Sequence, residues 1–329
     1  MSVRHFCTYF DHNYLPRAVV MLESLHEHCP HAHVHVLCLS EQCYDALTAF
    51  AYPYVSLIRL DELEAADPKL AATRSTRSLI EYYFTITPCL PWFLLAKDIG
   101  IKEITYLDAD MMFFSSPEPI FEEAQDASVI ITPHRFSAHL TDLIKYGIYN
   151  VSWMTFRSTV EGIKCLSWYR DACLEWCNDE LETDRFADQK YLDSFPKLFK
   201  GVHSIEHNGC GVAPWNLADA KVEQKNNLIT INREVLIFFH AQGFKNIRGP
   251  FYSSGLRNFH SKLSSAAKEY IVKPYAQSYV AAVQQSMSVV GVNSFVGIRK
   301  EQKKTRKFLR DCKNIFQEWK NQSLVVCWS

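Results

Sequence analysis

Two aspartates separated by one residue stand at the end of an apolar run in the middle of the chain. The run "ITYL" (104–107) is typical of a β-strand, and Asp108 and Asp110 follow it directly. In an extended backbone, residues two apart point to the same side, so both carboxylates would enter one small space. Two like charges at that distance are costly unless a cation lies between them. The pair therefore predicts a site for a divalent metal ion.

A histidine far along the chain is a candidate to complete this site. The segment "FFHAQGFK" (238–245) overlaps a strand expected at 234–240, which would end on His240. In an open α/β sheet, ligands collect outside the carboxyl ends of the strands, where we expect His240 to meet Asp108 and Asp110. Carboxylates alone suit Mg²⁺, and an added imidazole moves the preference toward Mn²⁺. Three protein ligands would leave metal positions open for diphosphate oxygens.

Two further residues of the same segment extend this prediction. Gly243 would let the chain turn closely around a ligand, and Lys245 would place an ammonium group beside phosphate charge. The structural alternative is that His240 only ends a buried strand and that Lys245 is a solvated surface charge. The expected proximity of His240 to the two aspartates favours the ligand-binding interpretation.

The end of the first expected strand carries candidates for nucleotide contact. The segment "TYFDHNYL" (8–15) holds Thr8, Tyr9, Asp11 and Tyr14. In a doubly wound fold, a nucleotide base and its ribose lie at this position, although both tyrosines can equally be core residues. Arg77 would meet phosphate or base, or form a surface ion pair. Neither GxGxxG nor GxxxxGK[ST] occurs, which argues against dinucleotide and P-loop sites.

Two later segments suggest contact with a sugar. "FADQKYLDSF" (186–195) places Asp188 and Gln189 at the start of an expected helix, where an acid can hold sugar hydroxyls or simply interact with the helix dipole. The glycine-bearing loop 208–216 contains Trp215, whose flat ring can stack on a sugar or belong to the core.

The order of expected elements positions these residues on an α/β fold. Strands are expected at 3–10, 33–40, 54–60, 104–107, 127–132, 147–157 and 234–240, and helices at 16–28, 41–50, 74–98 (broken near Pro88) and 158–180. Such alternation predicts a mostly parallel, Rossmann-like sheet flanked by helices. Residues 1–250 are expected to form one catalytic domain, and residues 251–329 a helical appendage. The apolar stretch 78–96 carries Glu81 and two prolines and is not expected to span a membrane.

The charge of the chain is unevenly distributed. The formal net charge is −1, but residues 299–322 hold nine Lys or Arg against three acids. Phe308, Cys312, Ile315, Phe316 and Trp319 fall at helical spacing on one face of this segment. That face would dock on anionic lipid or pack on its own domain as a capping helix. Nucleic acid is not an expected partner, because the basic segment is short and its aromatic residues share one amphipathic face.

The cysteine content favours the cytoplasm. The chain has 11 cysteines, an odd number, with no CxxC pair, and its first residues run directly into an expected strand rather than a signal peptide. Reduced thiols in the cytoplasm are the expectation, with the inner face of a membrane as the place where the basic segment would bind.

Five segments, in this order, carry a resemblance to a known family: "YLDADMMFF", "IYNVSWMTF", "FADQKYLD", "HNGCGVAPWNL" and "FFHAQGFK". They resemble GT-A fold glycosyltransferases related to glycosyltransferase family 8, of the kind associated with bacterial surface-polysaccharide synthesis. The resemblance covers roughly residues 3–250. It implies a hexosyltransferase that uses a nucleoside diphosphate sugar, with UDP as the expected nucleotide, and a glycan or lipid-linked acceptor.

The resemblance also implies residue roles. Asp110 and His240 would bind Mn²⁺, Asp108 would contact metal and ribose, Lys245 would contact the diphosphate, and Asp188 and Gln189 would lie beside the donor sugar. Family members commonly show Asn, a small residue and Gly on the strand before a long helix, whereas this chain reads Asn150, Val151 and Ser152. Asn150 would still hold the donor sugar, but the departure leaves the identity of the sugar open. Transfer with retention at the anomeric carbon rests on the resemblance alone.

Three other functions compete with this interpretation. A phosphohydrolase of the haloacid dehalogenase type also has two aspartates after an apolar strand, but near the start of its fold. A sugar nucleotidyltransferase would need a Gly-rich basic loop after the first strand, and "FDHNYLPRA" is not one. An inactive sugar-nucleotide-binding module tethered by its basic tail is the non-enzymatic alternative. Release of phosphate from simple phosphomonoesters would distinguish the first from a transferase.

Overall fold

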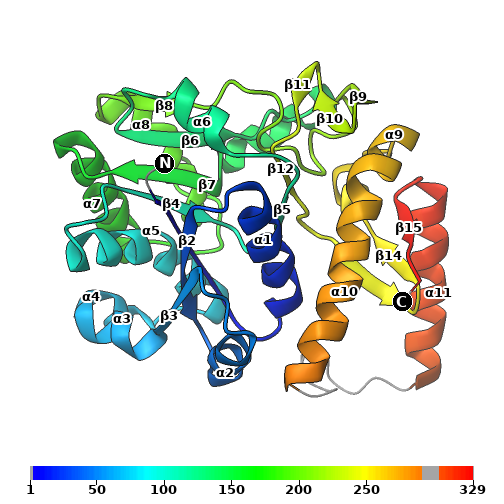
Figure 1. Cartoon of the computed structure of the whole chain (residues 1–329), viewed down its shortest axis with the longest axis horizontal. Helices are drawn as coiled ribbons and strands as arrows, with labels where there is room; N and C mark the ends of the chain where they lie inside the picture. Colours follow the sequence, from blue (N-terminus) through cyan, green and yellow to red (C-terminus); the bar gives the residue numbers. More distant parts are fainter. Residues whose placement is uncertain (1–2, 291–303, 329) are drawn as a thin grey trace.

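The computed structural model describes residues 3–290 and 304–328 (Figure 1). Its main sheet has seven strands in the order β3-β2-β1-β4-β7-β6-β8. These strands are β1 (Arg4–Phe10), β2 (Ala32–Cys38), β3 (Val55–Arg59), β4 (Glu103–Leu107), β6 (Val129–Pro133), β7 (Tyr149–Arg157) and β8 (Val202–Ser204). The pairs β3-β2, β2-β1, β1-β4 and β6-β8 are parallel, and β7 is antiparallel to both of its neighbours. This mixed, mainly parallel sheet confirms the predicted fold class.

Alternation along the strands sends side chains into two apolar layers. Phe6 packs in the layer that contains α1 and α2, whereas its neighbour Cys7 packs in the layer of α5 and α7. The helices of this part of the chain are α1 (Leu15–His28), α2 (Glu41–Phe50), α3 (Leu60–Ala66), α4 (Pro68–Thr73), α5 (Leu79–Lys97), α6 (Glu118–Glu123), α7 (Val160–Glu175), α8 (Phe195–Leu198) and the 3-10 helices η1 (Ala138–Tyr146) and η2 (Gln189–Ser194). The sheet is therefore covered on both faces, as a central, largely parallel sheet requires.

The predicted break near Pro88 was wrong, because α5 runs without interruption from Leu79 to Lys97 with both prolines inside it. Each proline removes one backbone N–H donor, but most of the helix is buried against β4 and α7, so tertiary packing offsets the loss. The Tyr9 hydroxyl of β1 donates to the carbonyl of Tyr83 in α5 at 2.8 Å, which further ties the helix to the sheet. By length and composition α5 suits a membrane span, but 61% of that stretch is buried inside the protein, which is typical of a core helix.

The predicted strand 234–240 is divided in the structure. β11 (Glu234–Val235) pairs with β10 (Leu228–Ile231), which also pairs with β9 (Val222–Lys225). β12 (Phe238–His240) then pairs antiparallel with β5 (Met111–Phe113). The division arises because the Leu236 N–H still donates to the carbonyl of Ile229 in β10, while the Ile237 N–H donates to the carbonyl of Gly209. His240 therefore belongs to a two-stranded ribbon and not to the main sheet.

The C-terminal region contains strands as well as the expected helices. Its elements are β13 (Lys245–Arg248), β14 (Phe251–Ser253), η3 (Leu256–Phe259), α9 (Ser265–Ala267), the π-helical turn η4 (Lys268–Val272), α10 (Lys273–Val290), α11 (Lys304–Lys320) and β15 (Leu324–Val326). Strands β13, β14 and β15 form an antiparallel sheet. Figure 1 shows α10 beside α1, and α11 on the outer side of β14 and β15. A division of the chain near residue 250 stays a prediction, and the β13-β14 hairpin crosses that position.

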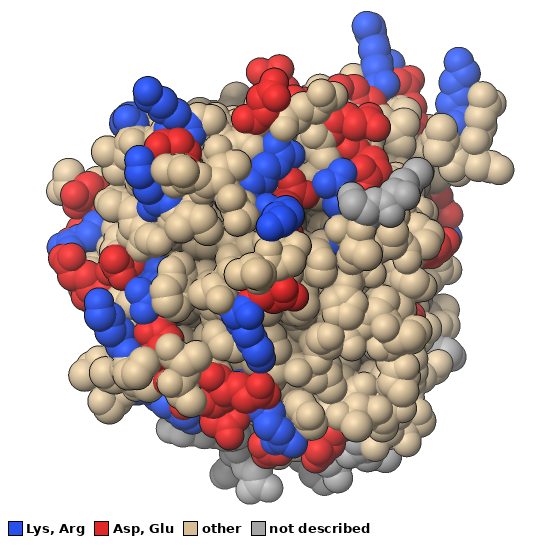
Figure 2. All heavy atoms as spheres, turned by 60° about the vertical axis from the view of Figure 1, so that its left-hand side comes forward, with Lys and Arg blue, Asp and Glu red and all other residues tan. Residues whose placement is uncertain are grey.

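Charged side chains of both signs are interspersed on the face shown in Figure 2, without one large area of a single sign. Part of the predicted basic segment, residues 299–303, lies outside the described residues.

Candidate active site

The aspartate pair and the distant histidine meet in space. Asp108 directly follows β4, and Asp110 lies in the turn that leads into β5. His240 pairs with Met111 across the β5-β12 ribbon, and the Ala241 N–H donates to the Asp110 carbonyl at 2.9 Å. This ribbon places the His240 Nε2 atom 3.0 Å from Asp110 Oδ1 and 3.7 Å from Asp108 Oδ2.

The three side chains have the composition and spacing of a metal site. One ligand atom from each of Asp108, Asp110 and His240 lies within 4.8 Å of the other two. Two carboxylate oxygens and one imidazole nitrogen suit Mn²⁺, and also Mg²⁺ with less contribution from the histidine. Within the described part of the chain, His240 is the only residue that forms an ion pair with either aspartate. The two carboxylates thus share one imidazole as their ion-pair partner. Ionisation of both is costly unless a further cation binds between them.

The pKa values also show that burial and the neighbouring charges oppose each other at these three residues. Burial raises the pKa of Asp108 to about 6, against the effect of the charged His240. Burial also acts to raise the pKa of Asp110, but the charge and hydrogen bond of His240 outweigh it and the pKa is lowered. For His240, burial acts to lower the pKa, and the Asp110 carboxylate outweighs it, so the pKa is raised.

A cavity of about 670 Å³ opens at this cluster, which is a typical size for a ligand site. Nine predicted site residues line it: Tyr9, Asp11, Tyr14, Asp108, Asp110, Asn150, Asp188, Gln189 and His240. Trp215 also lines the cavity, with its ring centroid 5.4 Å from that of His240. The amide nitrogen of Asn150 lies 3.4 Å from the Gln189 Oε1 atom, which joins two of the residues predicted for sugar contact.

Three predicted site residues do not line the cavity. The Thr8 side chain is completely buried in β1, and Lys245 is exposed at the start of β13. Arg77 donates to the Leu174 carbonyl at 2.8 Å and to the Thr85 hydroxyl, so it joins the start of α5 to α7. The predicted roles of these residues in donor binding stay predictions.

Arg77 offers a direct test of its role. We expect Arg77→Ala to lower the free energy of unfolding by about 1–3 kcal/mol, because the Leu174 carbonyl loses a charged donor. The KM for the sugar donor that the resemblance implies is expected to change less than about 2-fold, since Arg77 does not line the cavity. Urea unfolding and steady-state kinetics on the same preparation measure both quantities. A large rise in KM with unchanged stability would instead place Arg77 at the donor.

Several lining residues were missed by sequence reasoning. They are the polar residues His134, Tyr106 and Gln242 and the aromatic residues Tyr83, Phe84, Phe136, Tyr146, Phe186 and Phe259. The Tyr106 hydroxyl donates to Asp108 Oδ1 at 3.0 Å, and the spacing of two residues on one strand could have indicated this contact. His134 directly follows β6, so the rule that ligands collect at strand ends could also have identified it.

His134 lies beside Asn150, one of the residues predicted for sugar contact. Its Nε2 atom is 3.3 Å from the Asn150 amide nitrogen, and its ring stacks on Phe136 with centroids 4.4 Å apart. Burial lowers its pKa to about 3, so the ring is neutral at physiological pH and can accept the Asn150 N–H. This contact fixes the amide orientation from which Asn150 faces the cavity.

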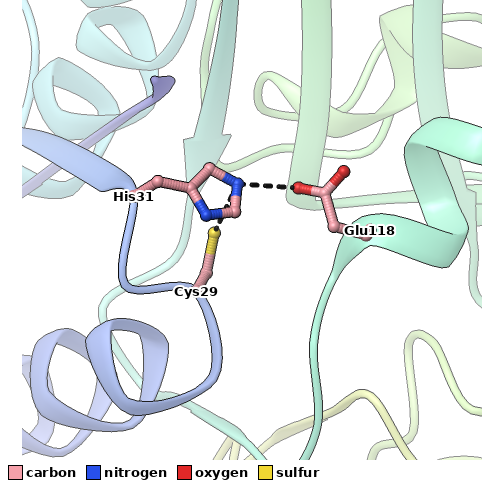
Figure 3. A group of neighbouring side chains, drawn as sticks. All are labelled: Cys29, His31 and Glu118. Atoms are coloured by element: carbon pink, nitrogen blue, oxygen red, sulfur yellow. Dashed lines mark hydrogen bonds and ion pairs between the residues drawn. The ribbon is translucent and has the colours of Figure 1, made fainter. Parts of the chain in front are cut away.

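A second cluster of metal-ligand types lies apart from the cavity, at the end of α1 and the start of α6 (Figure 3). His31 Nε2 is 3.7 Å from Cys29 Sγ and 3.1 Å from Glu118 Oε1. Arg4 donates to both carboxylate oxygens of Glu118, at 3.1 and 2.8 Å. Burial raises the pKa of Cys29 to about 11. The carboxylate is thus already neutralised by a guanidinium and the thiol stays protonated, so hydrogen bonds explain this cluster without a metal ion.

Comparison with known proteins identifies relatives of this chain. No family model matches it. YfnD of Bacillus subtilis (strain 168), an uncharacterized protein, is 33% identical over 247 residues, which cover 74% of this chain and 79% of YfnD. The chain belongs to the YfnD family. YfnF of the same organism, also uncharacterized, is 28% identical over 248 residues, covering 73% of this chain and 81% of YfnF.

Solved structures show which fold this YfnD family member has. The galactosyltransferase LgtC, in complex with donor and acceptor sugar analogs, superposes with a TM-score of 0.50 and 13% identity over 84% of this chain and 95% of LgtC. The glycosyltransferase GlyE of Streptococcus pneumoniae TIGR4 gives a TM-score of 0.50 and 14% identity over 91% of this chain and 67% of GlyE. The chain therefore has the GT-A glycosyltransferase fold, as predicted. Membership of glycosyltransferase family 8 stays a prediction.

Proposed function

We propose that the protein is a metal-dependent glycosyltransferase that moves a hexose from a nucleoside diphosphate sugar, with UDP as the expected nucleotide, to a glycan or a lipid-linked acceptor. The observation that carries this proposal is the meeting of Asp108, Asp110 and His240 in the wall of a cavity large enough for a nucleotide sugar. The GT-A fold gives it context. Retention at the anomeric carbon and a place in surface-polysaccharide synthesis belong to the same proposal.

A metal ion at this site would supply the charge that departure of a nucleoside diphosphate requires. Asp108, Asp110 and His240 would hold a divalent ion, Mn²⁺ or Mg²⁺, which acts as a Lewis acid toward the diphosphate oxygens. Tyr106 orients Asp108 through its hydroxyl, and the β5-β12 ribbon orients His240. These contacts hold the ligand atoms in place before a metal ion binds.

Other residues of the cavity wall would bind and position the sugar. Asn150, Gln189 and Asp188 offer amide and carboxyl groups for sugar hydroxyls. Tyr9 and Tyr14 are proposed to face the base and ribose, together with Asp11. Trp215 and the aromatic residues around it supply flat apolar surfaces that exclude water from the reacting carbon. Contact of Lys245 or Arg77 with the diphosphate remains a prediction, because neither residue lines the cavity.

Two alternative functions, a phosphohydrolase of the haloacid dehalogenase type and an inactive binding module, are judged by different observations. The haloacid dehalogenase interpretation does not agree with a GT-A fold in which the aspartates follow β4 beside the antiparallel β7. The inactive-module interpretation is tested by activity. We also propose a cytoplasmic location with contact to the inner face of a membrane through residues 299–322.

A thermal-shift screen of UDP-, GDP- and TDP-sugars with and without Mn²⁺ tests the proposed function. We expect a UDP-sugar with Mn²⁺ to raise the Tm by roughly 3–6 °C at a ligand concentration of about 100 Kd, since only the native state binds it. Asp110→Asn is the matched control and is expected to lose the Mn²⁺-dependent part of the shift. Equal shifts with and without metal would contradict metal-dependent binding of the donor. Release of UDP in the presence of an acceptor then separates a transferase from a binding module.

A further inference from the structure

The helix α11 packs on the protein in the opposite sense to an ordinary surface helix. Its acidic residues Asp311 and Glu318 are each 4% exposed, whereas Leu309, Phe316 and Trp319 are 64%, 59% and 65% exposed. A surface helix normally turns its apolar stripe inward and its charges outward. Here the two carboxylates face the β13-β14-β15 sheet, and the apolar residues face away from it.

Specific contacts hold this orientation. The Ser253 hydroxyl donates to Glu318 Oε1 at 2.9 Å, and the Ser323 hydroxyl donates to Glu318 Oε2. Arg257 pairs with Glu318 at 3.6 Å, and Arg248 pairs with Asp311 at 3.8 Å. Buried carboxylates are tolerated only when they are paired in this way. The helix therefore packs on the protein through its polar side, and the predicted packing of its apolar face as a cap was wrong, because Phe316 and Trp319 are exposed.

The outward side of α11 is a continuous apolar strip. At 100° per residue, five residues fall within an arc of about 100°. They are Phe308, Leu309, Cys312, Phe316 and Trp319, all of them exposed, and they are called the outer strip below. Single exposed apolar residues are ordinary, but a contiguous group on one helix marks an interaction surface.

The charges beside the outer strip indicate the partner. Lys313 and Lys320 follow it at about 120–140° around the helix, and Lys307 is also exposed. Both acids of the described helix are turned inward and paired, so the outward charge is positive. A second copy of this chain would bring like charges together across the strip. A bilayer with anionic headgroups offers the complementary charge and an apolar layer beneath it.

We propose that the outer strip of α11 inserts into the interface of an anionic membrane, with the lysines at headgroup level and the polar side anchored to the β13-β14-β15 sheet. This specifies which surface meets the membrane and which lipid charge it needs. Its location at the inner face of a membrane rests on the proposed function, whereas lipid binding itself does not require transfer activity. A protein that binds vesicles but transfers no sugar would contradict the proposed function alone.

Binding to vesicles of phosphatidylcholine, with and without about one-third phosphatidylglycerol, tests the proposal on the full chain. Cys312 is exposed and the ten other cysteines are buried, so an environment-sensitive fluorophore can be placed within the outer strip. We expect a blue shift and increased emission with the anionic vesicles, and at least a 10-fold weaker response with neutral vesicles or at high salt. Equal binding to both kinds of vesicle, or none to either, would overturn the proposal.

Matched variants separate lipid binding from loss of fold. Phe316→Ser combined with Trp319→Ser is expected to weaken sedimentation of the unlabelled protein with anionic vesicles at least 10-fold without lowering the Tm, because both side chains are already exposed. Ile99→Ser combined with Leu198→Ser removes two other exposed apolar residues and is expected to leave binding unchanged. If the α11 variant instead converts a dimer into a monomer in analytical ultracentrifugation and vesicle binding is absent, the strip is a contact between copies and the proposal fails.

Discussion

Asp110→Ala is expected to lower metal-dependent sugar transfer by at least about 10³-fold while leaving the fold intact. Asp110 supplies the carboxylate nearest to His240, at 3.0 Å, so its loss removes one ligand and the partner that orients a second. The diphosphate leaving group would then depart without the charge that stabilises it. Steady-state rates of UDP release over a range of Mn²⁺ concentrations measure the effect, and circular dichroism checks the fold.

A parallel variant and a matched control make this result specific. His240→Ala is expected to cause a loss of similar size, because the imidazole comes from a different element but from the same group of ligands. His31→Ala removes a histidine from the second cluster, where Arg4 already neutralises Glu118, and is expected to retain the activity of the unmodified protein. Full activity of Asp110→Ala at saturating Mn²⁺ would contradict the metal site, whatever the behaviour of His240→Ala.

The candidate metal site was only partly predictable from the sequence. The two aspartates share one face because residues two apart in an extended chain always do, and the structure places both beside one cavity. The participation of His240, 130 residues later, followed from the rule for strand ends, but that rule located it on the wrong sheet. The β5-β12 ribbon depends on pairing between distant segments, which no local pattern encodes. Lys245 was predicted from its spacing after His240 and from the family resemblance, and it does not line the cavity.

The parts of the fold that sequence analysis predicted correctly are those with a strong local period. β1, α1, β2, α2 and β3 alternate as their apolar patterns indicate. The continuity of α5 was missed because the energetic cost of its prolines is local, whereas its burial against β4 and α7 is not. Three aromatic residues of the cavity wall, Phe136, Phe186 and Phe259, were missed because they lie outside the α-helices and β-strands, where no periodic pattern marks them.

The C-terminal helix shows a further limit of pattern reading. The spacing of its apolar residues predicted an amphipathic helix, and α11 is one. Periodicity identifies a face but not the direction in which it points. That direction is set by the partners of Asp311 and Glu318 on neighbouring strands and turns, which become neighbours only after folding. The buried carboxylates are tolerated here because these partners supply their hydrogen bonds and ion pairs.

Asp188→Asn is expected to make the protein more stable at neutral pH and less active. The carboxyl is buried in the wall of the cavity, and burial raises its pKa to about 7, with a further contribution from the Asp108 charge and an opposing hydrogen bond from Thr87. The pKa in the unfolded chain is about 4. Between these values the folded state binds more protons than the unfolded state, so the free energy of unfolding falls as the pH rises through this window.

An asparagine cannot ionise, so the folded state of the variant does not lose stability through a buried negative charge at this position. The gain in stability of Asp188→Asn is therefore expected to be near zero at pH 4 and to reach about 4 kcal/mol above pH 7, three pKa units at roughly 1.4 kcal/mol each. The corresponding rise in Tm is roughly 5 °C at pH 8. Differential scanning calorimetry in EDTA from pH 4 to pH 8 measures it without interference from a metal ion. Asp171→Asn, at a largely exposed aspartate, is the control and is expected to change the Tm by less than about 1 °C at any pH.

The activity of Asp188→Asn tests whether the destabilising carboxyl of Asp188 is needed for sugar transfer. Asp188 lies next to Gln189 in the cavity wall, where a charge beside the donor sugar is useful to a transferase and costly to an empty site. We expect kcat of Asp188→Asn to fall by about 10²-fold with a smaller change in KM, because a carboxylate would assist mainly when positive charge develops at the reacting carbon. Higher stability with unchanged kcat would make Asp188 a residue of the cavity wall only. Lower stability at pH 8 would show that its ionised form is held by partners that more than offset burial.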